Sequence, residues 1–385
     1  DHARYQASQA QLRQAKNQLS QLKKASGDLN VMDLSERSKP RQTHVLQRGV
    51  WDQKGETVSH RFPERIFNPK SMSSDNRLDL AKWLVHRKNP LTARVLANHL
   101  WQICLGEGLV RTPDDFGLQG EFPTHPDLLD WLAVELMENN WDIKHLLKVI
   151  VTSQTYRQSS AITAKLQEQD PDNRLIARAS RYRLPSWMIR DAALRSSGLL
   201  NYQLGGPTVL PYQPDGIWAE MFMGRFRYQP SPGNLQFRRT IYAFWRRSAA
   251  PTFLFDSSQR RLCEVKPRRT NTPLHALTLL NDLSLLEASR ALAKRSITEN
   301  QQPQSRIPFL FRQVLSRDPT PDEQQLLVRQ LELARSYYNS SPEQARQFLD
   351  FGQLENKVTN NHVEIAAYMI VANLVFNLDE AISRE

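Results

Sequence analysis

Helical periodicity is the feature that most constrains the fold of this chain. From Asn76 to the C-terminus, apolar residues recur at the three- and four-residue spacings of amphipathic helices. Asn89 and Pro90 fit an N-cap followed by a first-turn proline, which is a helix-start signal. The pattern predicts a mainly α protein with helices at about 90–105, from 124 onward, and at 142–153, 185–199, 237–247, 273–296, 304–316, 321–338, 342–354 and 361–380.

Three regions follow from the distribution of this pattern along the chain. We expect an N-terminal helical arm over residues 1–30, an extended arm or linker over 31–75, and one large helical domain over 76–385. The linker carries one short candidate strand at Thr43–Val50. Within the domain, residues 201–236 are rich in Gly, Pro and Tyr and predict a long irregular segment, which in a compact domain is usually functional or flexible.

The N-terminal arm has a weak heptad pattern. Its apolar or small residues alternate spacings of three and four, at Tyr5, Ser8, Leu12, Ala15, Leu19 and Leu22. This coiled-coil-like seam indicates one half of a helical pair, whose partner lies upstream in a longer chain or in another chain. It permits a homo-oligomer through this helix, and a simple surface helix is the alternative.

The charge balance is basic, and it bears on possible partners. Lys and Arg number 51 against 40 Asp and Glu, a formal net charge of +11. Such a chain can favour nucleic acid, acidic glycans or membrane surfaces, or can spread the charge for solubility. No helix-turn-helix, RNP or zinc pattern accompanies the charge, so we do not expect a nucleic-acid partner. No apolar run approaches the ~18 residues of a membrane span.

Local metal and cofactor motifs are missing from the sequence. The histidines are never closer than the 13 residues between His86 and His99, which excludes HExxH and HxH metal motifs. The sequence has no CxxC, CxxCH, GxGxxG, P-loop or GxSxG pattern. We therefore expect no cofactor and no locally bound metal in this chain. The two cysteines, Cys104 and Cys263, can form one disulfide or remain two free thiols.

The stretch NPLTARVLANHLWQ, residues 89–102, is the first candidate ligand site. Arg94, Asn98 and Trp101 lie at i, i+4 and i+7 of a predicted helix and therefore share a face. A Trp on a polar face suits stacking on a sugar ring. The alternative is an Arg–Asn network that bridges to a neighbouring helix.

The loop between the next two predicted helices, residues 108–132, is the candidate catalytic region. Thr124 begins the second helix, with Asp127 three residues on as in a capping box, so His125 falls in its first turn. The helix dipole there disfavours an imidazolium, and a neutral His125 near Asp114 or Asp115 suits a general base or a metal ligand. We nominate His125 and Asp115 as catalytic. The alternative is turn and capping roles for the aspartates and a packed histidine.

Arginines and aromatic residues interleave in residues 234–258. Arg238, Tyr242 and Trp245 or Arg246 share a stripe of the predicted helix, and neighbouring Arg239 is nominated as ligand-binding. Such residues can bind nucleic acid or form cation–π contacts within the fold. Asp256 is a plausible buried partner for one of these arginines.

The stretch RRTNTPLHALTLLND, residues 268–282, is the candidate anion site. Thr272 fits an N-cap before Pro273, and Arg268 and Arg269 stand just outside this helix start, where N–H groups attract anions. The anion can be a ligand's carboxylate, sulfate or phosphate, or a neighbouring Asp of the same protein. Asn281 is nominated from the same stretch.

Five ordered stretches of this chain together resemble a known family: NRLDLAKWLVHRKNPLTARVLANHLWQ, GEGLVRTPDDFGLQGEFPTHPDLLDWLA, IVTSQTYRQSS, RRTNTPLHALTLLND and EIAAYMIVANLVFNLDE. They are similar to the C-terminal domain family of unknown function in large planctomycete-type proteins. Two departures stand out: NHLW places His99 where an Arg is expected, and ICLG, Ile103 to Gly106, replaces a His-rich segment. No catalytic residues are established for the family, so none carries over.

The resemblance implies a helical fold, a secreted or periplasmic protein, and parent chains that often carry c-type haem in an upstream domain. The chain itself opens without a signal peptide or initiator Met, which indicates a fragment or a processed chain. Its link to polysaccharide breakdown is looser.

Two functions are consistent with these patterns. The first is an extracytoplasmic domain of a glycan-processing, cytochrome-linked protein that acts on or binds acidic or sulfated polysaccharide. The second is a non-catalytic docking module that holds the cytochrome-c-like domain or another partner. An enzyme needs Asp115, His125 and the arginines around one pocket, whereas scattered residues, each satisfied within the core, favour docking.

Overall fold

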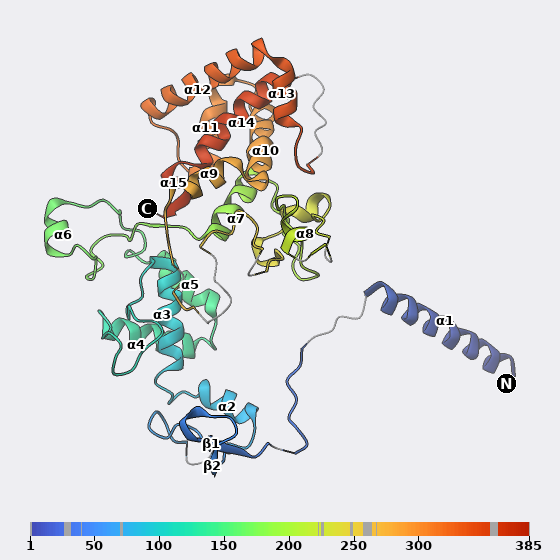
Figure 1. Ribbon diagram of the computed structural model, residues 1–385, viewed down its shortest axis with the longest axis vertical. Coiled ribbons are helices and arrows are strands. Elements are labelled where there is room, and N and C mark those ends of the chain that lie inside the picture. The colour runs from blue at the N-terminus through green and yellow to red at the C-terminus, as the bar shows by residue number, and fades with distance from the viewer. Residues whose placement is uncertain are drawn as a thin grey trace. The chain divides into compact units, whose positions relative to one another are not determined.

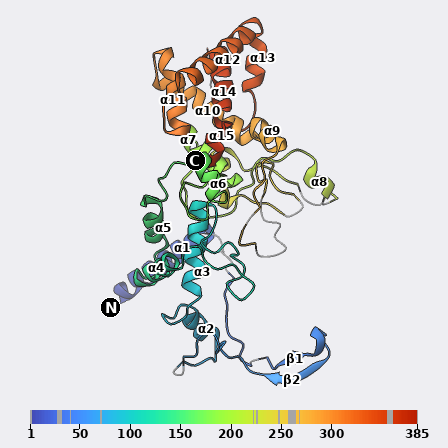
Figure 2. The same cartoon turned by 90° about the vertical axis from the view of Figure 1, so that its left-hand side faces the viewer.

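The structure of this chain, a computed structural model, describes residues 2–26, 32–39, 41–69, 72–221, 223–224, 227–246, 249–256, 264–266, 268–354 and 361–384. The chain divides into two compact units, Asp1–Thr92 and Ala93–Glu385. Fifteen α-helices and four short strands occur in the described ranges, which confirms the mainly α fold (Figures 1 and 2).

The first unit contains two helices and one hairpin. α1 spans His2–Ser26 and α2 spans Arg77–Leu84, while β1 (Thr43–Leu46) pairs antiparallel with β2 (Lys54–Val58). The predicted strand thus ends at Leu46, where the 3-10 turn η1 (Gln47–Gly49) begins the hairpin connection.

A small aromatic cluster packs against α2. Trp83 is buried, stacks on Phe62 with ring centroids 5.6 Å apart, and donates from Nε1 to the Phe67 carbonyl. Asn76 caps the helix, because its side chain accepts from the Asp79 amide.

The second unit begins with three helices around one apolar cluster. They are α3 (Thr92–Leu105), α4 (Pro126–Glu138) and α5 (Ile143–Thr152). The Asn89 side chain accepts hydrogen bonds from the amides of Leu91 and Thr92, close to the predicted helix start. The predicted capping box at Thr124 is wrong. His125 is the N-cap residue without a side-chain cap, and Thr124 donates its hydroxyl to the Leu109 carbonyl instead.

A larger helical core occupies the C-terminal part of the second unit (Figure 1). α14 (His362–Phe376) is buried on most of its circumference and packs against α10 and α12, as expected for a helix that is apolar all round. The helices here are α7 (Ser186–Ser197), α9 (Pro273–Asn281), α10 (Leu283–Glu299), α11 (Arg306–Leu315), α12 (Pro321–Ser340), α13 (Pro342–Leu349) and α15 (Asp379–Ile382), with the 3-10 turn η4 (Pro303–Ser305).

Two predicted helices differ from those observed. The helix predicted over 273–296 breaks at Asp282, which ends α9 and caps α10 by accepting from the Ser284 amide. The helix predicted over 237–247 is wrong. In its described residues, 237–246, the helical turns are the end of η2 (Gly233–Phe237) and η3 (Thr240–Tyr242), both 3-10, and Arg238 and Ala243 form single bridges to residues 201 and 209.

The described residues of the Gly/Pro/Tyr-rich segment are irregular, as predicted, apart from α8 (Ile217–Met221) and the 3-10 turn η2. Buried arginines hold it in place. Arg190 donates to the carbonyls of Arg238 and Gln236, and Arg238 donates to those of Pro207 and Gly205. Three more elements complete the described chain: α6 (Ala164–Gln169), and β3 (Tyr182–Arg183) paired antiparallel with β4 (Ser383–Arg384).

Candidate anion site

Tyr182 lies at the centre of a group of arginines in the second unit. Its hydroxyl donates to the carbonyl oxygens of Ile103 and Cys104 at the end of α3, at 3.1 and 3.0 Å. Its ring covers Gly106, where an added Cβ would lie 2.6 Å from the ring. Burial raises the pKa of the Tyr182 phenol, so it stays a neutral hydrogen-bond donor.

Arg269 stacks on this ring. Its guanidinium carbon lies 4.2 Å from the Tyr182 centroid, and one terminal nitrogen is 3.3 Å from the Gly106 carbonyl. Its Nε is buried and has no hydrogen-bond partner in the described part of the chain. A buried N–H without a partner is costly, so an acceptor that reached this donor would be stabilised by it.

Arg384 and Arg183 add two more cations around the tyrosine. Arg384 is paired with Tyr182 across the two-stranded sheet, stacks on Tyr156 and donates to the carbonyls of Ser180 and Tyr156. Arg183 is buried, and its Nε donates to the Thr270 carbonyl at 2.6 Å. Burial lowers the pKa of Arg183, and the adjacent Asp256 opposes that shift.

Asp256 is the internal anion of this group. It forms an ion pair with Arg183 and accepts from the Thr270 amide and hydroxyl at 2.8 and 2.7 Å. Burial by itself would raise the pKa of Asp256, but the hydrogen bonds from Thr270 and the Arg183 charge hold it below the ordinary value. The observed partner of Asp256 is thus Arg183, which lies outside the 234–258 stretch where its partner was expected.

These residues form what we call the Tyr182 site: Tyr182, Arg183, Asp256, Arg269 and Arg384. Within the described ranges, Arg183 alone of the three guanidinium groups pairs with the Asp256 carboxylate, and the hydrogen-bond acceptors of Arg269 and Arg384 are carbonyl oxygens. A carbonyl satisfies a hydrogen bond without neutralising a charge. The site therefore keeps an excess of positive charge, which suits an anion.

The stretch that contains the predicted anion site contributes part of the Tyr182 site. Arg269 enters it, whereas the neighbouring Arg268 is exposed. Thr272 and Pro273 begin α9 as predicted, and the Thr272 amide lies 3.4 Å from Nδ1 of His275. Asn281, at the end of α9, is exposed and donates to the Leu277 carbonyl one turn back.

The face predicted on α3 is used within the fold. Arg94 forms an ion pair with Asp130 of α4. Asn98 is fully buried and binds both backbone groups of Val110, donating to its carbonyl at 3.0 Å and accepting from its amide at 2.9 Å. This matches the alternative of an Arg–Asn network that bridges to neighbouring segments.

Trp101, also on α3, borders a small cavity. The cavity measures about 30 Å³, room for about one water molecule, and Arg111 and Arg174 also line it. Arg111 pairs with Glu107, and Arg174 pairs with Glu121. A sugar ring does not fit inside such a space, so Trp101 has no enclosed stacking pocket here.

His125 and Asp115 have separate local partners. Nδ1 of His125 lies 3.0 Å from the Thr124 hydroxyl, and an Asp115 carboxylate oxygen accepts from the Gly117 amide at 2.6 Å. No hydrogen bond joins Asp115 to His125 in this described loop. Their acid–base role stays a prediction.

Arg239 is exposed beside Tyr202, whose ring centroid lies 5.9 Å from its guanidinium carbon. The preceding arginine, Arg238, stacks on Tyr242 at 3.8 Å, which confirms the cation–π alternative for this stretch. The hydrogen bonds of both tyrosines lie within the fold, since Tyr202 accepts from Arg195 and Tyr242 accepts from the Gly205 amide.

Sequence reasoning missed Tyr182, Arg183 and Arg384. The only local signal was the alternation of arginine and tyrosine in SRYRL, residues 180–184, which resembles the interleaving noted near Arg238. Cys104 is a buried free thiol, and burial raises its pKa. Cys263 lies outside the described residues, so its pairing does too.

The comparisons with known proteins concern the family alone. Residues 76–331 match the family described as PSD1, a protein of unknown function (DUF1553), which covers more than half of the chain. The chain belongs to this family. No curated protein and no solved structure gave a significant match to this DUF1553 chain. The described helices include none long and apolar enough to cross a membrane, and the described residues include no group of three or more His, Cys, Asp or Glu placed to hold a metal ion.

Proposed function

We propose that the second unit of this chain binds acidic or sulfated polysaccharide at the Tyr182 site. The observation that carries the proposal is the buried Nε of Arg269, a donor without a partner in the described ranges, in a site whose other two cations, Arg183 and Arg384, are accompanied by one carboxylate, that of Asp256. Sulfate esters and carboxylates accept hydrogen bonds from guanidinium groups in a planar, often bidentate arrangement. An anionic group on a sugar would both accept a hydrogen bond from the Arg269 Nε and offset the excess positive charge of the site.

Exposed Arg268 extends the same positive potential toward solvent. A long polymer would thus contact Arg269 through one anionic group while its neighbouring sugars remain outside. We assign binding to this site, because the nominated catalytic residues His125 and Asp115 are not among its members.

We propose further that the parent protein is secreted or periplasmic. The support is the resemblance to large planctomycete-type proteins, in which c-type haem is carried by an upstream domain. The binding site would then hold the parent protein on a polymeric substrate.

Calorimetric titration tests the proposal. The chain is titrated with a sulfated, a uronate-rich and a neutral polysaccharide, together with R269Q and the matched control R312Q, which removes an exposed α11 arginine paired with Asp318. We expect R269Q to weaken binding of the anionic polymers about 10-fold, the loss of one charge-assisted contact, and R312Q to change it little. Equal losses in both variants would show a diffuse charge effect, and equal binding of the neutral polymer would contradict the site.

A docking role is the second candidate, and α1 favours it. Every described side chain of this helix, from Arg4 to Leu22, is exposed, including its apolar residues. Long helices in water are stabilised mostly by packing of an apolar face, so this one calls for a partner.

A further inference from the structure

The apolar seam of α1 has nothing covering it in the described chain. Its four large side chains, Tyr5, Leu12, Leu19 and Leu22, are 61, 57, 54 and 66% exposed. They follow the heptad spacing, with Ser8 and Ala15 at the intervening seam positions. A row of large apolar residues on a helix of 25 residues is a binding surface rather than a set of scattered exposed residues.

The width of the seam favours a helix as the partner over a membrane surface. Polar residues flank it on both sides, at Gln9, Gln11, Lys16 and Gln18. A strict stripe of this kind is the seam of a coiled coil, whereas a helix that lies on a membrane needs a wider apolar face with large residues. The small Ser8 and Ala15 also allow a second helix to approach closely.

The charge of α1 determines which kind of helix can pair with it. The α1 sequence contains five cations, Arg4, Arg13, Lys16, Lys23 and Lys24, and no Asp or Glu. Arg4, Lys16 and Lys23 occupy the positions that flank the seam, where interhelical ion pairs choose the partner. A second copy of α1 brings the same cations without a carboxylate to pair them, so self-association gathers like charge.

We propose that α1 docks an acidic helix of a separate partner protein, one with apolar residues at its seam positions and Glu beside them. The Glu side chains would pair with Arg4 and Lys16 across the seam, while Leu12 and Leu19 pack in its middle. This inference rests on the docking role of the chain and is independent of polysaccharide binding at the Tyr182 site.

The test uses the full chain and two designed helical peptides with the same Leu/Ile heptad seam. One carries Glu at the flanking positions and the other carries Lys. Binding is followed by fluorescence anisotropy, and we expect the Glu peptide to bind at least about 10-fold more tightly than the Lys peptide, with the difference reduced at high salt. Sedimentation of the chain alone and flotation with anionic phospholipid vesicles run in parallel.

Two pairs of variants make the test specific. L12N/L19N should weaken binding of the Glu peptide at least about 10-fold, whereas Q14N/Q21N, on the opposite face, should not, and R4E/K16E should reverse the peptide preference. All six positions are exposed, so the substitutions leave the rest of the fold intact. Self-association abolished by L12N/L19N would overturn the acidic partner but keep docking, with a second copy as the occupant. Vesicle binding alone, or no binding at all, would overturn both.

Discussion

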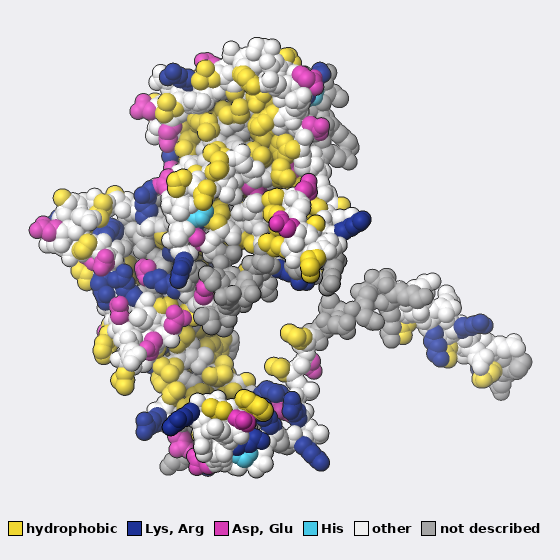
Figure 3. All heavy atoms as spheres, in the orientation of Figure 1, with side chains coloured by type: hydrophobic (Ala, Val, Ile, Leu, Met, Phe, Trp, Pro, Cys, Tyr) yellow, Lys and Arg dark blue, Asp and Glu magenta, His cyan; other side chains and the backbone are white. Residues whose placement is uncertain are grey.

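Arg190, Arg238 and Arg290 are almost fully buried, and each donates hydrogen bonds to backbone carbonyls of loops, a 3-10 turn or a helix end. Part of the basic excess thus lies inside the fold, which composition alone cannot reveal. On the visible surface, Lys and Arg are interspersed with Asp and Glu (Figure 3). The contact of Arg238 with Tyr242 was foreseeable from the interleaved residues, but the carbonyls it binds depend on how a loop closes.

Asn98 should be a stability residue. Replacing it with Ala leaves the buried amide and carbonyl of Val110 without partners, so N98A should lower the free energy of unfolding by about 3 kcal/mol, measured by urea denaturation. The control is N281A, whose side chain is exposed and should change stability by no more than about 0.5 kcal/mol. Equal losses of stability in the two variants would show that the hydrogen bonds of Asn98 to the Val110 backbone do not stabilise the fold.

Gly106 should be required by the ring of Tyr182. Its φ is +88°, and an added Cβ would lie 2.6 Å from the ring, so G106A should cost about 3 kcal/mol of unfolding free energy. Gly216 is a control that separates the cost of the positive φ from the cost of the clash with the ring. Its φ is +85° with no atom near the added Cβ, so G216A should cost only about 1 kcal/mol. If G106A lowered the unfolding free energy no more than G216A does, the Tyr182 ring would not pack against Gly106.

Local signals predicted most elements of this fold, and contacts distant in sequence decided the exceptions. Helices with a cap and a first-turn proline, such as α9, begin where expected. The break between α9 and α10 depends on Asp282, which also accepts the Thr252 hydroxyl, a partner that no local pattern specifies. The predicted 237–247 helix fails because the Arg238 and Thr240 backbones are bound by Arg190 and Asp191 of α7.

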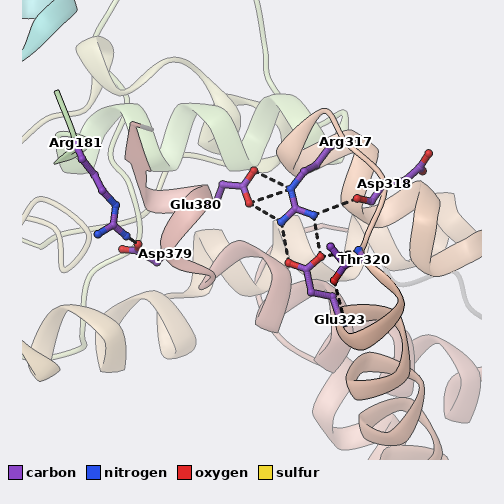
Figure 4. A network of polar contacts seen from close by, with 7 residues as sticks. All are labelled: Arg181, Arg317, Asp318, Thr320, Glu323, Asp379 and Glu380. Atoms are coloured by element: carbon purple, nitrogen blue, oxygen red, sulfur yellow. Dashed lines mark hydrogen bonds and ion pairs between the residues drawn. The ribbon is translucent and has the colours of Figure 1, made fainter. Parts of the chain in front are cut away.

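At the start of α12, Glu323 contributes both a cap and an ion pair (Figure 4). Its carboxylate accepts from the Thr320 amide at 2.7 Å and binds Arg317, which also binds Glu380 of α15. Hydrogen bonding to Arg317 lowers the pKa of Glu323 to about 2. Gln can keep the capping contact, so the loss of the ion pair with Arg317 predicts that E323Q costs about 1 kcal/mol near neutral pH.

The pH dependence of this cost follows from the lowered pKa. The stabilisation is complete above the ordinary Glu pKa of about 4.3 and is lost as pH falls through about 2, so the gap between wild type and E323Q should close over that window. Thermal denaturation at a series of pH values measures it. E332Q, an exposed change on the same helix, should show no such window. A gap that persists below pH of about 2 would contradict the carboxylate's role.

Over the whole molecule, sequence reasoning identified the class of fold and one part of the candidate site. The Tyr182 site combines the end of α3, two short strands and the chain around 256 and 270, so its members are separated by many residues in sequence. Only Arg269 was nominated in advance, because it stands beside a recognisable helix start. Tyr182, Arg183 and Arg384 come from strands of two residues, which leave no periodic signal, and Asp256 was singled out only as a partner for an arginine.

Removing residues 1–26 should leave the stability of the remaining chain unchanged within about 0.5 kcal/mol, because the described α1 side chains are exposed. Calorimetric melting of the full and shortened chains measures this difference. A lower melting temperature of the shortened chain would show that α1 packs on the chain itself. That result would contradict the proposal that a helix of another protein covers its seam.

The most direct test of the central claim, that the Tyr182 site holds an anionic group, is a crystal structure of the chain soaked with selenate, an anomalous analogue of sulfate. The account predicts an anomalous peak about 3 Å from Nε of Arg269, displaced when a sulfated oligosaccharide is added and absent in R269Q. Crystals that show selenate at other arginines but none beside Arg269, or a peak that a sulfated oligosaccharide does not displace, would contradict it.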